Sequence, residues 1–395
     1  MQRVKRGLSD MRWVVDDGIS VTPALKQLMG ETRLVAGRDI TPSVLADAEV
    51  LLVRSITEVD AALLEGSAVR FVGSATAGTD HIDGAALSRL GVGWSAAPGS
   101  NAIAVVEYVL SAIAVSGFLE PALNGLGVGI VGLGEVGYRL AGRLSRLGCS
   151  VMAFDPLRRQ WPDEITQASL EEVLAQPIVS LHASLHSQTP FASRGLLDEK
   201  HAHRVVAAAE KLGSGLFINA ARGDLVTPEA LARLLASPLT VVLDTWPGEP
   251  VLPKALLAAA NWVSPHIAGH SVDAKERGSD MLARALAHWA GGSGEEKPAT
   301  FSGEITPVVT PIEDPGGSSD ALDWASAFLK KQGTLEREDA RLRASSSDGL
   351  IAQDFDILRK TYQQPSEWSG RTIRIGSGSD ELRTMARRLG MSVVE

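Results

Sequence analysis

Short runs of apolar and β-branched residues alternate along most of the chain with segments whose apolar positions recur at helical spacing. Nine of these runs predict buried strands: MRWVV, EVLLVR, VRFVGSA, VGIVGLG, SVMAFD, IVSLHA, GLFINA, LTVVLD and NWVSPH. Helical spacing lies between them, for example over 136–147 and 228–236. Strands buried on both faces and separated by helices are typical of parallel sheets. The pattern therefore predicts an α/β protein with two Rossmann-like, doubly wound parallel-sheet domains.

The same pattern predicts where the domains begin and end. A helix over 102–115 would join the two sheets, and a helix over 272–290 would return the chain to the first. A Gly-, Pro- and Ser-rich linker follows, and then helical patterns and the strand RTIRIG predict a small α+β domain whose expected role is dimerisation. The expected division is a disordered N-terminal arm at 1–10, a substrate-binding domain at 11–106 and 269–292, an NAD-binding domain at 107–268, and the linker with the C-terminal dimerisation domain at 293–395. Met11, where the first strand begins, is a candidate start codon.

Composition narrows the possible partners. The formal net charge of −9 and the pI of about 5.5 give no sign of nucleic-acid binding. The single cysteine, Cys149, excludes an internal disulfide framework and a cysteine-rich zinc site, and indicates the reducing cytoplasm. No apolar signal-peptide core follows the basic N-terminus, and the longest apolar stretch is interrupted by Glu107. We therefore expect a cytoplasmic protein that does not bind a membrane.

The segment GIVGLGEVG carries the G-x-G-x-x-G spacing of a dinucleotide-binding loop. Alone this motif is weak, but here a predicted strand precedes it and an amphipathic helix follows it. The first glycine permits the tight turn, the second lets a pyrophosphate approach the backbone, and the third lets helix and strand pack closely. The helix N-terminus then faces the phosphates. The residues expected to contact the cofactor here are Gly132, Gly134, Glu135, Val136 and Gly137.

An acidic residue, Asp155, ends the next predicted strand, 18 residues beyond Gly137. Its carboxylate would accept hydrogen bonds from the adenosine ribose and would repel a ribose phosphate. Arg158 and Arg159 follow closely and weaken this preference slightly. The sequence therefore favours NAD over NADP as the cofactor.

Three further predicted strands end in polar residues. Arg222 follows INAA, Asp244 and Glu249 follow the strand LTVVL, and His266 follows NWVSP. Ligands of open parallel sheets bind outside the carboxyl ends of the strands, so these side chains can converge on one molecule.

Arginine, glutamate and histidine together suit hydride transfer from a 2-hydroxy acid. A neutral imidazole can take the hydroxyl proton as hydride leaves the adjacent carbon. A carboxylate on the other ring nitrogen fixes the tautomer, and a guanidinium binds the substrate carboxylate in bidentate fashion. Each residue alone is more often a salt-bridge partner, but three of them beside a dinucleotide loop indicate a dehydrogenase.

The order GLGEVG, NAARGDLV, DTWPGEP, SPHIAGH resembles the D-isomer-specific 2-hydroxyacid dehydrogenase family. The segments LLVRSITEVD, RFVGSATAGTDHID and DFDILRKTY extend the resemblance to a homodimeric branch acting on a phosphorylated hydroxy acid. The resemblance implies catalytic roles for Arg222, Glu249 and His266 and substrate contacts by Ser55 and Thr76. The NAD contacts that it implies are Asp155, Asp244, Gly269, and the backbone of Ala220, Ala221 and Arg222.

Two positions depart from the family pattern. His270 stands where a substrate-binding tyrosine is usual, and it can still donate a hydrogen bond to a phosphate. Ala183 replaces a usual threonine, which removes one cofactor hydrogen bond worth roughly 1 kcal/mol. His266 and His270 could reach one metal ion, but no cysteine or acidic cluster nearby completes a ligand shell, so we expect no metal.

Two alternatives to the function that this resemblance implies stay open. The enzyme could act on another acid, such as 3-phosphoglycerate, or the chain could be a non-enzymatic NAD-sensing protein on a dehydrogenase scaffold. The complete set of Arg222, Glu249 and His266 argues against a sensor, because a sensor needs no proton acceptor.

Overall fold

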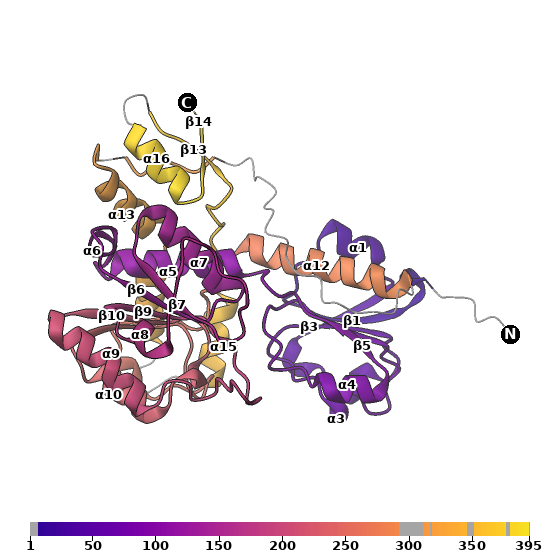
Figure 1. Ribbon diagram of the computed structural model, residues 1–395. Helices are drawn as coiled ribbons and strands as arrows, with labels where there is room; N and C mark the ends of the chain where they lie inside the picture. Colours follow the sequence, from indigo (N-terminus) through magenta and orange to yellow (C-terminus); the bar gives the residue numbers. More distant parts are fainter. Residues whose placement is uncertain (1–6, 292–310, 317, 346–350, 377–379, 395) are drawn as a thin grey trace. The chain divides into compact units, whose positions relative to one another are not determined.

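The computed structural model describes residues 7–291, 311–316, 318–345, 351–376 and 380–394. These residues form two compact units (Figure 1). The first comprises Met1–Asn101 and Ser271–Glu304, and the second comprises Ala102–His270 and Ile305–Glu395, in each case as far as they are described. The described C-terminal residues therefore group with the second unit.

The first unit is built on a five-stranded parallel sheet in the order β2-β1-β3-β4-β5. Trp13 and Leu282 belong to one buried core of this unit, and Val14 and Leu51 to another, since adjacent strand residues point to opposite faces. The strands are β1 (Arg12–Asp16), β2 (Glu31–Val35), β3 (Val50–Val53), β4 (Phe71–Ser74) and β5 (Gly93–Ser95), and the helices are α1 (Pro23–Leu28), α2 (Pro42–Leu45), α3 (Ala61–Leu64), α4 (Gly84–Leu90) and α12 (Val272–Gly291).

Part of the expected disordered arm is ordered. Leu8–Asp10 form a 3-10 turn, and Leu8 is buried in the same core as Trp13. The indole of Trp13 donates a hydrogen bond to the Leu8 carbonyl at 3.1 Å. The basic composition of this segment led us to expect disorder, but the apolar residue Leu8 anchors it to the core. Residues 1–6 lie outside the described residues.

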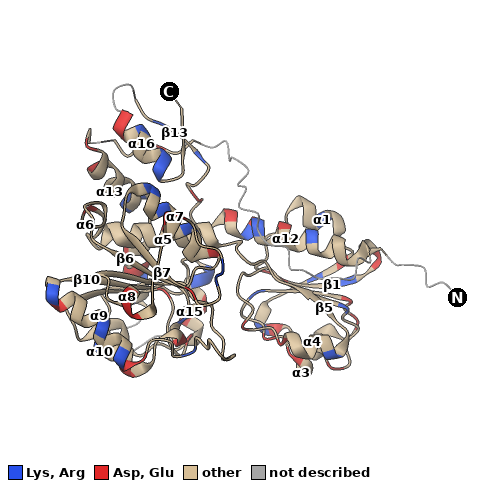
Figure 2. Ribbon diagram, viewed as in Figure 1, with Lys and Arg blue, Asp and Glu red and all other residues tan. Residues whose placement is uncertain are grey.

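The second unit contains a seven-stranded parallel sheet in the order β12-β11-β10-β9-β6-β7-β8. Strands such as β6 and β10 appear tan in Figure 2 because they carry no charged residue, which suits burial on both faces. The strands are β6 (Val128–Val131), β7 (Val151–Phe154), β8 (Thr166–Gln167), β9 (Ile178–Leu181), β10 (Gly215–Asn219), β11 (Leu239–Leu243) and β12 (Trp262–Val263). The helices are α5 (Ala102–Val115), α6 (Leu119–Leu123), α7 (Glu135–Leu147), α8 (Leu170–Leu174), α9 (Glu199–Leu212), α10 (Pro228–Leu235) and α11 (Lys254–Ala259). All nine predicted strands, and the two helices predicted over 102–115 and 272–290, are confirmed.

The described C-terminal residues form four helices and a two-stranded parallel sheet: α13 (Ala321–Gln332), α14 (Leu335–Ala344), α15 (Ala352–Lys360), β13 (Thr372–Arg374), α16 (Asp380–Arg388) and β14 (Ser392–Val394). Trp324, Phe328 and Trp368 share a core with residues of α5 and α7. The carboxylate of Glu107, buried in α5, accepts hydrogen bonds from the backbone N–H groups of Trp368 at 3.0 Å and Ser369 at 2.7 Å. The C-terminal segment is thus held by apolar packing and by the buried carboxyl group of Glu107.

Helix α14 covers the edge of the large sheet. Asp339 accepts a hydrogen bond from the N–H of Val263, in edge strand β12, at 2.9 Å. Arg343 donates to the carbonyls of Leu257 and Ala260, which end α11. These contacts satisfy backbone groups that a bare sheet edge and a helix end would leave open.

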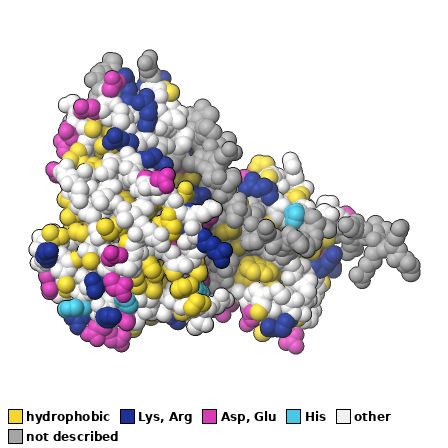
Figure 3. All heavy atoms as spheres, viewed as in Figure 1, with side chains coloured by type: hydrophobic (Ala, Val, Ile, Leu, Met, Phe, Trp, Pro, Cys, Tyr) yellow, Lys and Arg dark blue, Asp and Glu magenta, His cyan; other side chains and the backbone are white. Residues whose placement is uncertain are grey.

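Charges of both signs lie on the outer helices. Over α9 and α10 Figure 3 shows acidic, basic and histidine side chains intermixed, and Arg233 of α10 forms an ion pair with Glu199 of α9. In the part of the chain that the structure describes, no helix is long and apolar enough to span a membrane.

Candidate active site

The glycine-rich loop after β6 is packed tightly except at one position. Gly132 has φ +91°, and a methyl group there would overlap the backbone of Ala183. A methyl group on Gly137 would overlap the carbonyl oxygen of Gly132. In contrast, a methyl group on Gly134 would meet no heavy atom within 4 Å. The open space beside the Gly134 backbone is where a pyrophosphate can approach.

Helix α7 begins directly after this space. Gly134 is its N-cap and supplies no side-chain hydrogen bond, so the first N–H groups of the helix stay available for an anion. Glu135 would repel an anion at this end, but its carboxylate pairs with Arg139 at 2.6 Å. Glu135 and Val136 form the first two positions of the helix, directly after Gly134.

Asp155, just after β7, holds the loop through a backbone contact. Its Oδ2 accepts a hydrogen bond from the N–H of Leu133 at 2.7 Å, and its Oδ1 accepts one from Leu157 at 2.9 Å. Arg158 donates to the Leu133 carbonyl at 2.8 Å and lies over the Tyr138 ring. Asp155 remains partly exposed, as a ribose contact requires, whereas the Arg158 guanidinium already binds the loop.

The loop after β10 is shaped by an asparagine. The Asn219 amide donates to the carbonyl of Arg222 at 2.9 Å and accepts from the N–H of Ala221 at 3.1 Å. Thr245, from the loop after β11, donates to the same Asn219 oxygen at 3.2 Å. Asn219 thus ties the backbone of Ala220–Arg222 to the neighbouring strand end.

The loops after β10 and β11 also pack directly against each other. A methyl group on Gly223 would overlap the backbone of Trp246. The Trp246 N–H donates to Glu249 Oε1 at 2.6 Å, and its indole donates to the Ser264 carbonyl at 2.9 Å. Trp246 therefore positions Glu249 between the segments that carry Arg222 and His266.

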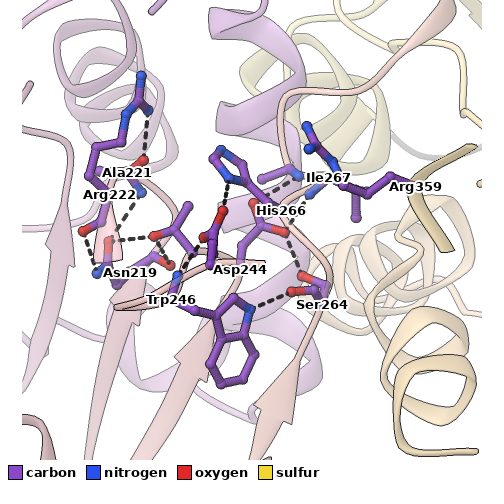
Figure 4. Close-up of polar contacts among 12 residues, drawn as sticks. Asn219, Ala221, Arg222, Asp244, Trp246, Ser264, His266, Ile267 and Arg359 are labelled. Atoms are coloured by element: carbon purple, nitrogen blue, oxygen red, sulfur yellow. Dashed lines mark hydrogen bonds and ion pairs between the residues drawn. The ribbon is translucent and has the colours of Figure 1, made fainter. Parts of the chain in front are cut away.

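His266 and Glu249 form a close pair. The distance from His266 Nδ1 to Glu249 Oε2 is 2.7 Å, which leaves Nε2 of the imidazole for a substrate (Figure 4). His266 has φ +55°, and among the described residues it is the one non-glycine residue with positive φ. A left-handed backbone at a non-glycine residue costs of order 1–3 kcal/mol and persists only where surrounding contacts hold it.

Asp244 provides those contacts. Its carboxylate is buried and accepts hydrogen bonds from Ser264 Oγ at 2.7 Å, Ile267 N at 2.7 Å and Ala268 N at 3.0 Å. The Tyr108 hydroxyl lies 2.7 Å from Ser264 Oγ and extends the network into α5. Asp244, expected to contact NAD, therefore also fixes the turn on which the histidine stands.

The electrostatics of the pair favour a charged glutamate. Burial raises the pKa of Glu249, but the His266 charge, the hydrogen bonds from His266 and Trp246, and the Arg359 guanidinium outweigh it, so that the net pKa is lowered. Burial raises the pKa of Asp244, against the opposing effects of His266 and of its hydrogen-bond donors.

Ser55 and Thr76, the expected substrate contacts, belong to the first unit. Ser55 is exposed in the turn after β3. Thr76 follows β4, and its hydroxyl lies 2.7 Å from Ser74 Oγ and donates to the Gly78 carbonyl at 3.1 Å. Ser74 in turn lies 2.9 Å from His81 Nε2. Both residues thus stand at carboxyl ends of parallel strands.

Gly269 and His270 follow the His266 turn in the second unit. The two histidines have different neighbours: His266 pairs with Glu249, whereas His270 Nε2 lies 3.5 Å from a guanidinium nitrogen of Arg359, and its ring centroid is 6.4 Å from that of Tyr362. The described residues contain no group of three or more His, Cys, Asp or Glu side chains that could hold a metal ion.

Comparisons with known proteins show the family of this chain. Residues 112–268 match the family model described as D-isomer specific 2-hydroxyacid dehydrogenase, NAD binding domain. The chain is 37% identical to an erythronate-4-phosphate dehydrogenase of Klebsiella pneumoniae, over 97% of this chain and 99% of that protein. A relative of the same name from Citrobacter koseri is 39% identical over the same shares. This chain belongs to the D-isomer-specific 2-hydroxyacid dehydrogenase family.

Solved structures of the dehydrogenase fold are similar to this chain. The 3-phosphoglycerate dehydrogenase of Entamoeba histolytica, bound to NAD, superposes with a TM-score of 0.61 at 19% identity, over 74% of this chain and 99% of its own. The D-lactate dehydrogenase of Aquifex aeolicus gives a TM-score of 0.58 at 18% identity, over 71% and 96%. Each is almost fully covered, so this dehydrogenase carries additional residues that they lack.

The sequence alone did not indicate several residues that shape the site. Asn219 could have been noticed, because an asparagine at the end of a strand often binds loop backbone. Ser264 and Tyr108 gave no signal, since their roles depend on contact with Asp244. Arg359 lies 89 residues beyond His270 in the chain and reaches it only through the fold.

Proposed function

We propose that this dehydrogenase oxidises the 2-hydroxyl of 4-phospho-D-erythronate with NAD, giving (R)-3-hydroxy-2-oxo-4-phosphooxybutanoate. The observation that carries the proposal is the Glu249–His266 pair at 2.7 Å, on strand ends next to Arg222 and in the same unit as the glycine-rich loop. The relatives' names support the choice of substrate, because the chain matches them over nearly their whole length.

The loop fits NAD. The space beside Gly134, the uncapped N-terminus of α7 and the carboxylate of Asp155 match a pyrophosphate and a ribose diol. We propose further cofactor contacts from Asp244, Gly269 and the backbone of Ala220–Arg222. The cofactor, when bound, accepts the hydride from C2 of the substrate.

The protein's own residues handle the proton and the carboxylate. Nε2 of His266 takes the proton of the C2 hydroxyl, and Glu249 holds the ring so that Nδ1 carries the other proton. Arg222 binds the substrate carboxylate through its planar guanidinium. Ser55, Thr76 and His270 are the proposed additional substrate contacts.

The cellular setting is also a proposal. We infer that the enzyme acts in the cytoplasm, in pyridoxal phosphate biosynthesis, as a homodimer formed through the C-terminal segment. The exposed Ile351 and Ile357 of that segment are side chains that such an interface would cover. Light scattering on the purified protein gives the mass, and a monomer at micromolar concentration would contradict a stable dimer.

The test is an absorbance assay for reduced nicotinamide. NAD is supplied with 4-phospho-D-erythronate, with 3-phosphoglycerate or with unphosphorylated D-erythronate, and the reverse reaction is run as well. Turnover confined to 4-phospho-D-erythronate is expected. Turnover on another acid alone would keep the mechanism and move the substrate, with His270 as the residue to examine.

A non-enzymatic NAD sensor is separated from an enzyme by His266→Ala. An enzyme loses most of its turnover with this change and still binds NAD. An absence of turnover by the wild type in both directions, with NAD binding intact, would favour the sensor.

A further inference from the structure

Helix α15 brings a cation from the C-terminal segment to the catalytic pair. Phe355 and Leu358 of this helix are buried in the same core as Val263 of β12, which fixes the helix beside the strand ends (Figure 1). Arg359, which follows Leu358, projects from the helix toward the His266 turn (Figure 4). The last turn of α15 is therefore anchored on one side and presents a guanidinium on the other.

The Arg359 guanidinium has a defined place. Its central carbon lies 5.8 Å from the centre of the buried Phe355 ring, and one of its terminal nitrogens lies 3.5 Å from His270 Nε2. Burial raises the pKa of Glu249, and the Arg359 charge acts with His266 and the Trp246 hydrogen bond to lower it. A cation thus stands within electrostatic range of the groups that carry out the proton transfer.

The position of Arg359 relative to Arg222 matches a substrate with two anionic ends. Figure 4 shows the two arginines on opposite sides of His266. In 4-phospho-D-erythronate C2 is bonded to the carboxylate carbon C1 and to C3, and the phosphate is carried at the far end of the C3–C4 arm. If His266 faces the C2 hydroxyl and Arg222 holds the carboxylate, then the phosphate extends toward Arg359 and His270.

We propose that Arg359 binds the phosphate group of the substrate, with His270 as a second donor, so that the C-terminal segment helps to select phosphorylated acids. This proposal rests on the proposed function. A guanidinium forms paired hydrogen bonds with phosphate, and an adjacent imidazole can add a third.

The test compares two substrates in steady-state kinetics of the full-length protein. Arg359→Met should lower kcat/KM for 4-phospho-D-erythronate by about 10- to 100-fold, mainly through KM, because a hydrogen-bonded charge is lost from substrate binding. The loss on unphosphorylated D-erythronate should be at least about tenfold smaller. Arg359→Lys should fall between the wild type and Arg359→Met, since it keeps the charge without the paired donors.

Lys360→Met is the matched control, because Lys360 is the exposed neighbour on the same helix and the change removes the same charge. This control should keep the wild-type preference for the phosphorylated substrate. Equal losses on both substrates in Arg359→Met would overturn the proposal and make Arg359 a positioning residue for Glu249. An unchanged kcat/KM would overturn it as well.

If the wild type does not oxidise 4-phospho-D-erythronate, the proposed function fails, and Arg359 is then judged by calorimetric titration of the NAD-loaded protein with inorganic phosphate. Phosphate binding that weakens at least about tenfold in Arg359→Met, but not in Lys360→Met, would support an anion site at this arginine. Equal affinities would overturn it.

Discussion

Gly134→Ala should separate cofactor binding from folding. Gly134 has φ −73° and ψ −154°, which alanine adopts without strain, and its added methyl group would meet no protein atom within 4 Å. Replacing glycine lowers the entropy of the unfolded chain, whereas alanine is a poorer N-cap, so the free energy of unfolding should change by less than about 1 kcal/mol. In the complex the methyl group occupies the space that the pyrophosphate needs. Overpacking of this kind costs about 1–3 kcal/mol, or about 5- to 150-fold in the Kd of NAD.

Gly137→Ala is the contrasting variant. Its methyl group would overlap the carbonyl oxygen of Gly132, so that the strand and α7 must move apart. We expect both variants to bind NAD more weakly in calorimetric titrations, and only Gly137→Ala to unfold at a clearly lower temperature. Wild-type affinity in Gly134→Ala would refute the placement of the pyrophosphate. A large drop in the melting temperature of Gly134→Ala would refute the conclusion that the methyl group meets no protein atom.

Three further variants test the groups around the reaction and the C-terminal segment. Glu249→Gln keeps a hydrogen-bond acceptor for His266 but removes the negative charge. In the absorbance assay kcat should fall about 10²- to 10⁴-fold, while the affinity for NAD is retained. A kcat within a factor of about two of the wild type would contradict the role of the carboxylate. Asp244→Asn loses acceptor capacity toward the turn that carries His266, so denaturant titration should show unfolding easier by about 1–3 kcal/mol, together with a lower kcat. An unchanged denaturation midpoint would argue against this anchoring role. Burial and the nearby Glu367 raise the pKa of Glu107 from 4.5 to about 8, so its contribution to stability is complete below pH 4.5 and is lost as the pH rises through about 8. Glu107→Gln should therefore flatten the fall in melting temperature between about pH 4.5 and 8, and identical slopes for both proteins would count against a protonated Glu107.

The core of each sheet could be predicted because its information is local. A strand buried on both faces needs a contiguous apolar run, and nine such runs were visible in the sequence. The strands that escaped prediction are short or exposed: β2 has no buried residue, β8 has two residues, and β5 and β14 have three each. Helix α14 was not expected because its sequence, LEREDARLRA, is mostly charged. It packs through the buried Leu335 and Leu342, and its buried Glu338 is paired with Arg337 and Arg341.

For the active site, the sequence by itself determined the dinucleotide loop and the set of polar residues at strand ends, because parallel strands place their carboxyl ends along one edge. Only the tertiary structure decided which histidine faces the glutamate. The backbone of His266 is held at positive φ by the contacts of Asp244 with the following turn, and that turn directs Nδ1 onto Glu249. The place of Arg359 was likewise decided by the packing of α15, since contacts between residues 89 positions apart leave no periodicity in the sequence.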